Sequence, residues 1–169
     1  MSDNVSYTGL VTQHHQYRVS TEWTGAGTTG TINYRAYGRS HVSRVPGRPA
    51  LLGSSDPAFR GDSGRWNPEL LLVATLSQCH LLQYLHLCAV NGVTVVAYQD
   101  DTSGAMAEDG EGGGRFTGVE LRPIVTVASP DMVERAEELH HEAAAKCFIA
   151  SSVNFPVTHS PRIHVRDPQ

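Results

Sequence analysis

Residues 67–92 read NPELLLVATLSQCHLLQYLHLCAVNG, and this stretch decides the fold. It opens on Asn-Pro-Glu, a typical helix start in which the Asn caps free backbone N–H groups and the Pro suits the first helical position. It closes on Asn-Gly, a typical helix stop. The residues between are apolar on nearly every side, which predicts a helix to about residue 89 that is buried in the middle of a domain.

Strands are predicted on both sides of this helix. Alternating or β-branched apolar residues mark them at residues 16–23, 31–39, 93–98, 119–127 and 156–165. Pro123 in the fourth of these suggests a sheet edge, because proline cannot donate to a sheet ladder. A Ser-Pro-Asp sequence at 129–131 starts a second predicted helix, which extends to about residue 150. This order of elements predicts the α+β class.

The remaining segments are predicted to be connections. Residues 45–65 contain three prolines and several glycines and serines, which predicts a long irregular loop of the kind that is often functional. The glycine-rich residues 109–114 predict a mobile hairpin tip. Residues 1–15 are predicted to be a flexible tail, which leaves residues 16–169 as a single domain.

Charge and hydropathy narrow the range of partners. The net charge of -4 leaves no basic footprint, which argues against nucleic acid or an anionic membrane as a partner. The longest apolar run, residues 70–76, is far shorter than the roughly 20 residues that span a bilayer. No apolar signal-peptide core precedes it near residue 1. We therefore expect a cytoplasmic protein.

The three cysteines are the first candidates for chemistry. Cys79 and Cys88 are nine positions apart on the predicted helix, which is about 180° of rotation, so they point to opposite sides. Cys147 lies near the end of the second predicted helix. Two packed helices could bring Cys79 and Cys147 within the roughly 4.4–6.8 Å between Cα atoms that a disulfide needs. The alternative is that all three are small buried apolar residues, as most free cysteines are.

The histidines do not predict a metal site. They include the pairs His14-His15 and His140-His141, together with His80 beside the cysteine. Neither a Cys-x-x-Cys nor a His-Glu-x-x-His spacing accompanies them, so we expect no metal and no cofactor. His140, two turns before Cys147, either lines a pocket or lies half-exposed on its helix.

The run Asn67-Pro68-Glu69-Leu70-Leu71, followed by Ala74 and Cys79, resembles the signature of the OsmC/Ohr family, the osmotically inducible and organic hydroperoxide resistance proteins. The resemblance extends in order and spacing over residues 16–166. It implies an OsmC-like fold, with antiparallel strands around a long buried central helix. It also implies an intertwined homodimer with sites at the interface.

The resemblance further implies a thiol-dependent peroxidase acting on organic hydroperoxides. Cys79 would be the attacking thiolate, which becomes a sulfenic acid, and Cys147 would resolve it as a disulfide. A dithiol such as a lipoyl group would then reduce the disulfide. Cys147 is followed by Phe148, where many members of the family carry proline.

Glu69 matches the acidic residue that orders an arginine beside the thiolate in this family. A thiolate in apolar surroundings is desolvated and disfavoured, and a guanidinium can reverse that penalty. Glu69 and Cys79 are ten residues apart, about 15 Å along one helix, so either the arginine bridges them or Glu69 comes from a partner chain.

The identity of that arginine separates the two branches of the family. One branch carries it on an early strand, where this chain offers Arg35 and Arg39, and the other in the loop before Asn-Pro-Glu, where it offers Arg60 and Arg65. We favour Arg60. The branch itself and the role of Cys88 stay open, and a non-catalytic ligand-binding protein or a redox sensor on the same fold is the alternative function.

Overall fold

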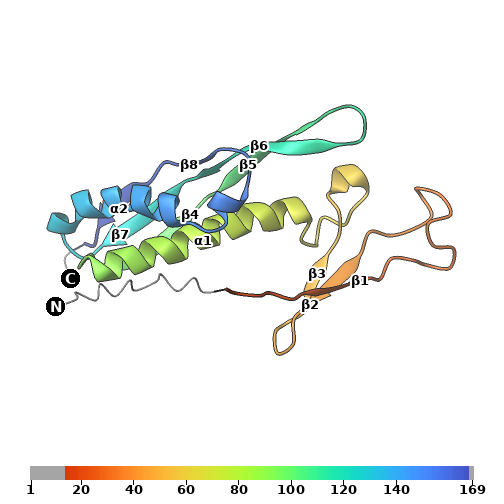
Figure 1. The fold of residues 1–169 in the computed structure, drawn as a ribbon, viewed down its shortest axis with the longest axis horizontal. Helices are drawn as coiled ribbons and strands as arrows, with labels where there is room; N and C mark the ends of the chain where they lie inside the picture. Colours follow the sequence, from red (N-terminus) through yellow and green to blue (C-terminus); the bar gives the residue numbers. More distant parts are fainter. Residues whose placement is uncertain (1–13, 168–169) are drawn as a thin grey trace, which may run out of the picture. The chain divides into compact units, whose positions relative to one another are not determined.

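The computed structural model describes residues 14–167, so residues 1–13 of the predicted tail lie outside the described residues. The chain divides into two compact units, Met1–Trp66 and Asn67–Gln169. Figure 1 shows the helices and strands of both units as a ribbon.

The first unit is a small antiparallel sheet. Its strands lie in the order β1-β2-β3, with β1 at Ser20–Trp23, β2 at His41–Arg44 and β3 at Leu51–Gly53. A short 3-10 helix, η1 at Pro57–Phe59, follows. The predicted irregular loop at residues 45–65 is therefore partly wrong, because it contains β3 and η1. Gly47, at φ 75°, allows the tight turn that joins β2 to β3.

The strand predicted at residues 31–39 is also wrong, because turns and bends occupy residues 27–37. The Asn33 side chain accepts a hydrogen bond from the Arg35 N–H over 2.9 Å, and the Asn33 carbonyl accepts one from Ala36 over 3.1 Å. Such local bonds give the backbone an alternative to a sheet ladder. Alternation of apolar residues alone did not reveal this competition.

The second unit is built on the helix predicted first. Helix α1 spans Pro68–Val90, and the Asn67 side chain caps it by accepting from the Leu70 N–H over 2.7 Å. Gly92, at φ 75°, follows its last turn. Its inward face is fully buried and carries Leu76, His80, Tyr84, Leu87 and Cys88. Its outward face stays exposed within one chain, with large apolar side chains that include Leu70, Leu82 and Val90.

Two three-stranded sheets accompany α1 in this unit. One has the order β4-β7-β9, formed by Val95–Asp100, Pro123–Val127 and Arg162–Val165. The other has the order β5-β6-β8, formed by Ser103–Glu108, Gly114–Leu121 and Val157–His159. In each sheet one pair is antiparallel, and the C-terminal strand, β9 or β8, pairs in parallel. The α+β class is confirmed, with two parallel pairs beyond the antiparallel pattern expected.

The chain passes between the two sheets at breaks that the sequence did not show. The predicted strand at 119–127 divides at Arg122 into β6 and β7, and the one at 156–165 divides into β8 and β9 around Ser160-Pro161. Pro123 therefore lies in the middle strand of its sheet, and the predicted edge position is wrong. Proline is tolerated there because it is the first residue of β7.

The second helix is shorter than predicted. A 3-10 turn, η2 at Pro130–Met132, precedes α2 at Val133–Lys146, and Cys147 is its extended C-cap residue. A further 3-10 turn, η3 at Ala150–Ser152, follows. Figure 1 shows α2 lying along α1, with which it makes many contacts. One apolar core lies between the two helices and the β4-β7-β9 sheet, and a second lies between the first half of α1 and the β5-β6-β8 sheet.

Candidate redox-active site

Two cysteines meet where α1 and α2 pack together. Cys79 lies in the middle of α1, and Cys147 ends α2. Their Sγ atoms are 2.8 Å apart, with the Cys147 thiol donating to Cys79. Both are free thiols; Cys147 is 2% exposed, and Cys79 is half-buried. Cys79 is thus the more accessible of the two, and Cys147 lies behind it within reach of a disulfide after a small movement.

Burial controls the protonation of Cys147. It raises the pKa of the Cys147 thiol to about 11, and the hydrogen bond to Cys79 acts in the same direction. The Ala150 N–H donates to Cys147 Sγ over 3.5 Å, which opposes this shift in part. Cys147 is therefore a neutral hydrogen-bond donor near pH 7, and it must lose its proton before or while its sulfur attacks.

Cys88 belongs to a different environment. It is buried in the core between α1, α2 and the β4-β7-β9 sheet. Burial raises the pKa of its thiol. It faces away from Cys79, as the helical spacing predicts, and nothing around it provides a disulfide partner among the described residues.

A cluster of histidines lies next to the cysteine pair. His80, the residue after Cys79, is buried, and its Nε2 lies 2.9 Å from Nδ1 of His140, which is fully buried on α2. The His140 ring stacks on Tyr84 with 3.8 Å between centroids. The His159 ring, at the end of β8, lies 5.6 Å from that of His80.

Burial also keeps these imidazoles neutral. Burial, and after it the neighbouring histidines, lowers the pKa of His80 to about 4 and that of His140 to about 3. The pKa of His159 is lowered by burial and then by His141. A neutral imidazole can accept a proton, so the cluster places proton acceptors beside two thiols.

The sequence did not predict this cluster, although two signals were present. His80 follows the cysteine directly, and His140 lies on the same helical stripe as Cys147, two turns earlier. His140 is fully buried, so the half-exposed position predicted for it is wrong, and it is not among the residues that line the cavity beside Cys147. Only the packing of α1 on α2 brings it to His80.

A small cavity lies between Cys147 and two of the histidines, His80 and His159. Its volume is about 30 Å³, enough for a water molecule. It is lined by Leu76, His80, Leu121, Ala144, Cys147, Ala150, Val157, Thr158 and His159. Apart from Thr158, its lining residues with hydrogen-bonding side chains are Cys147, His80 and His159.

Glu69 lies in the first turn of α1, away from this cavity. Its Oε2 atom is buried and has no hydrogen-bond partner among residues 14–167. A buried carboxylate oxygen without a partner is costly unless a cation or a donor reaches it. The position therefore suits the acidic residue that orders an arginine.

The four candidate arginines differ in their engagement inside the first unit. Arg39 lies over the Tyr34 and Tyr37 rings, and its guanidinium donates to both of their carbonyls. Arg65 pairs with Asp62 over 3.2 Å.

Arg60 and Arg35 are exposed, and neither guanidinium makes an ion pair or hydrogen bond within the described part of the chain. Arg60 alone among the described non-glycine residues has a left-handed backbone, at φ 65°. Arg60 and Arg35 thus keep a guanidinium available for another group.

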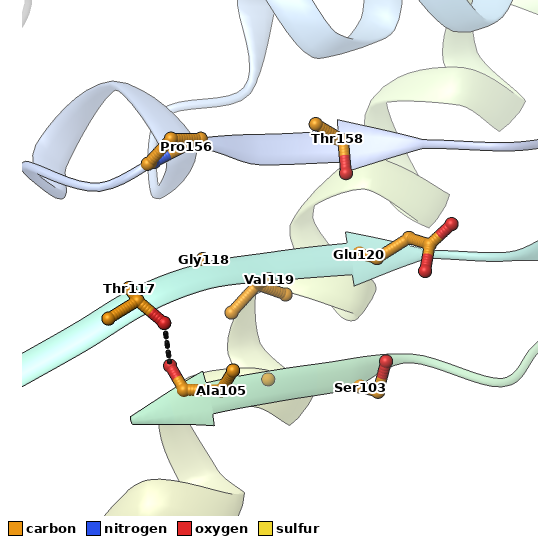
Figure 2. Close-up of a pocket in the computed structure, with 9 residues that line it drawn as sticks. Ser103, Ala105, Thr117, Gly118, Val119, Glu120, Pro156 and Thr158 are labelled. Carbon is orange, nitrogen blue, oxygen red and sulfur yellow. Dashed lines mark hydrogen bonds between the residues drawn. The ribbon is translucent and has the colours of Figure 1, made fainter. Parts of the chain in front are cut away.

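The other candidates for a functional site are a metal centre and a surface groove. No group of three histidine, cysteine or acidic residues among those described could hold a metal ion. A shallow groove of about 340 Å³ lies across β5, β6 and β8, as Figure 2 shows, where Thr117 donates to the Ala105 carbonyl. Its only ionisable side chain, Glu120, already pairs with Arg122 over 2.9 Å.

Comparison with protein families gives one match. The sequence profile of the family described as OsmC-like protein matches residues 61–161, which include Glu69, Cys79 and Cys147. No curated protein matches the chain significantly.

Several solved structures share the fold. An OsmC-like protein of unknown function from Vibrio cholerae is 27% identical, with a TM-score of 0.79, over 88% of this chain and 100% of the other. An organic hydroperoxide resistance protein OsmC from Legionella pneumophila is 16% identical, with a TM-score of 0.65, over 90% and 99%. One from Elizabethkingia anophelis is 15% identical, with a TM-score of 0.63, over 91% and 100%. The last two likenesses concern the fold alone.

Proposed function

Because the chain belongs to the OsmC-like protein family, we propose that it is a thiol-dependent peroxidase that reduces organic hydroperoxides. The observation that carries this proposal is the 2.8 Å separation of the Cys79 and Cys147 sulfurs. A half-buried thiol with a fully buried thiol behind it is the arrangement that a two-cysteine peroxidase needs. The first can meet a substrate, and the second can capture the oxidised product.

The proposed cycle has three steps. The Cys79 thiolate attacks one oxygen of the hydroperoxide, the O–O bond breaks, and the alkoxide leaves as an alcohol after taking up a proton. The Cys147 sulfur then attacks the sulfur of the Cys79 sulfenic acid, and water leaves as the disulfide forms. A dithiol, such as a lipoyl group, finally supplies two electrons and two protons that restore both thiols.

Arg60 and Glu69 are the residues proposed to keep Cys79 ionised. The unengaged guanidinium of Arg60 and its left-handed backbone support this role, because such backbone conformations cluster at functional sites. The unpartnered Oε2 of Glu69 supports a cation as its partner. Arg35 is the alternative, since its guanidinium is equally unengaged.

The proposed substrates are bulky and apolar. Leu82, which is exposed, lies one turn after Cys79 on α1, and the partly buried Leu72 lies two turns before it, beyond the buried Leu76. An alkyl or lipid chain gains more from such a surface than hydrogen peroxide does. We therefore expect alkyl and lipid hydroperoxides to react faster than hydrogen peroxide.

A homodimer in the cytoplasm is the proposed form of the protein. By length and composition, helix α1 could cross a bilayer, because an 18-residue stretch of it has a mean hydropathy of 1.3. Within one chain, only 22% of this stretch is buried. Core helices of soluble proteins meet the same length and hydropathy criteria. A second copy packed on the outward face would cover these apolar side chains.

A redox sensor is the alternative function, and one observation favours it. The raised pKa of Cys147 would slow disulfide formation unless a base assists it. A protein that forms the disulfide once but turns over slowly would signal peroxide rather than consume it. Steady-state consumption of hydroperoxide in the presence of a dithiol separates the two functions.

The decisive experiment follows the mass of the reduced protein after one equivalent of cumene hydroperoxide. The wild type should lose two hydrogens as the disulfide forms, whereas Cys147→Ser should gain one oxygen at Cys79. Cys88→Ala is the matched control and should behave as the wild type. An unchanged mass at Cys79, with no disulfide to Cys147, would rule out the peroxidase.

A further inference from the structure

The cavity behind Cys147 is more than a packing defect, because imidazoles line it. Cys147 faces it from the end of α2, His80 from α1 and His159 from the end of β8. Three elements far apart in the sequence thus bring a thiol and two proton acceptors around one space of about 30 Å³. A water molecule fits there and can link groups that do not touch.

We propose that His159 accepts the Cys147 thiol proton across this cavity as the disulfide forms, and then passes it to solvent through His141. The proposal rests on the proposed function for the sulfenic acid step. It adds to that function a proton-relay residue outside the cysteine, arginine and glutamate set.

His159 suits this role better than its neighbours. His80 Nε2 is already engaged with His140, and His140 does not line the cavity. His159 Nε2 is buried and has no hydrogen-bond partner within residues 14–167. Its ring also lies edge-on to that of the exposed His141, with 4.9 Å between centroids, which gives a route to solvent.

The step is balanced in atoms and electrons. The S–H proton of Cys147 moves to the neutral imidazole of His159, and the sulfur electron pair forms the S–S bond. The S–O bond of the Cys79 sulfenic acid breaks, and its electron pair leaves with hydroxide. The imidazolium gives its proton to solvent by way of His141, and the hydroxide takes up one proton from solvent, so one water molecule is released and no net proton is exchanged.

The surroundings keep His159 ready to accept a proton near pH 7. The titratable groups around it are His80 from α1, His140 and His141 from α2, and Cys147. Burial and His141 lower the pKa of His159 below the usual value of 6.5. The imidazole is therefore neutral, and resolution that uses it should depend little on pH between about 7 and 9.

The test starts the resolving step without peroxide. An aromatic disulfide reagent, dithionitrobenzoate, reacts with Cys79 and releases one coloured thiolate. Attack by Cys147 on the mixed disulfide releases the second, and the rate of this second phase is the rate of resolution. Cys147→Ser should abolish the second phase only.

His159→Gln should slow the second phase by about a hundredfold at pH 7 and leave the first unchanged. His164→Gln, at an exposed histidine on β9, the next strand along the chain, is the matched control and should have no effect. The deficit of His159→Gln should shrink with rising pH, because hydroxide then removes the thiol proton. A deficit that is constant with pH would indicate a packing role and overturn the relay.

The wild-type pH profile decides the question even if the variant fails to fold. A second-phase rate that rises about tenfold per pH unit from 7 to 10 would show an unassisted thiol and overturn the relay.

The failure of the relay and the failure of the peroxidase can be distinguished. If His159→Gln resolves the mixed disulfide as fast as the wild type while hydroperoxide still oxidises Cys79, only the relay is ruled out. If the wild type shows a normal second phase but does not react with hydroperoxide, only the peroxidase is ruled out.

Discussion

Burial of Cys147 makes its thiol a poor nucleophile near pH 7, while the same burial protects it from direct oxidation. In the proposed cycle, its 2% exposure means that a hydroperoxide would reach Cys79 first. Access rather than sequence position would then set the order of reaction. The raised pKa of Cys147 would also keep it protonated until the sulfenic acid has formed, which prevents a second thiolate from competing for substrate.

At Arg60, the first prediction concerns the charge that acts on Cys79. In a Cys88→Ala, Cys147→Ser background, Arg60→Ala should lower the fraction of Cys79 that is thiolate at pH 7. Loss of a neighbouring cation removes on the order of 1–2 kcal/mol of stabilisation from the ionised form, so the rate with cumene hydroperoxide should fall about tenfold or more. Thiolate ultraviolet absorbance and stopped-flow kinetics measure the two effects.

Arg35→Ala is the control for this prediction, because its guanidinium is exposed and equally unengaged among the described residues. It should leave both measurements at the values of the parent. If Arg35→Ala causes the loss and Arg60→Ala does not, the activating arginine lies on the early segment, and our assignment is wrong.

Among the elements, α1 was the most predictable, and its neighbours were less so. Its caps and apolar residues are encoded within the helix itself, and the Asn67 cap was found as expected. Strand β5 was missed because its residues, SGAMAE, are small or polar apart from Met106, and all six are exposed. The breaks at Arg122 and Ser160-Pro161 were missed because they depend on where two sheets meet, which no local pattern records.

The residues of the candidate site also differ in how far the sequence could predict them. A sequence motif at fixed spacings predicted Cys79, Glu69 and Cys147, and the structure brings the sulfurs of Cys79 and Cys147 together. The His80–His140 contact joins residues that are 60 positions apart and arises only from the packing of α1 on α2. Its energetic consequence, two imidazoles held neutral by burial, is a property of that interface.

The α1–α2 interface should therefore be sensitive to acid. The pKa of His80 is lowered from 6.5 to about 4 in the folded chain, so the unfolded chain binds more protons between these values. The free energy of unfolding must then fall as the pH falls through this window, and it is fully retained above about 6.5. One pKa unit corresponds to about 1.4 kcal/mol, so the expected loss is on the order of a few kcal/mol for the coupled pair.

His140→Phe tests this prediction while keeping a ring against Tyr84. At neutral pH it should cost about 1–3 kcal/mol, because His80 Nε2 loses its partner. At about pH 5 the deficit should shrink, because the variant has one fewer imidazole to protonate on unfolding. Urea denaturation at the two pH values measures both effects, with His164→Phe as an exposed control. A deficit that does not change with pH would contradict the assignment of the acid sensitivity to this pair.

At the scale of the whole molecule, the outward face of α1 is notable because its large apolar side chains stay exposed in one chain. The sequence predicted a helix buried on every side, yet one chain buries only its inward stripe. The prediction treated the helix as if one chain supplied all its neighbours. In the intertwined dimer that we propose, a second copy would supply the missing neighbours, and the apolar composition of α1 would reflect that assembly.

Leu82→Lys is expected to dissociate such a dimer. Leu82 is 68% exposed in one chain, so a lysine there does not disturb the core of the monomer. Burying its charge against a second copy costs several kcal/mol, which should weaken the dimer at least about a hundredfold. Sedimentation velocity over a range of concentrations measures this, with Met106→Lys, an exposed position on β5, as the matched control.

Peroxidase activity should fall together with the dimer fraction if the sites lie at the interface. A wild type that sediments as a monomer at all concentrations would contradict the prediction, and the apolar face of α1 would then need a different partner.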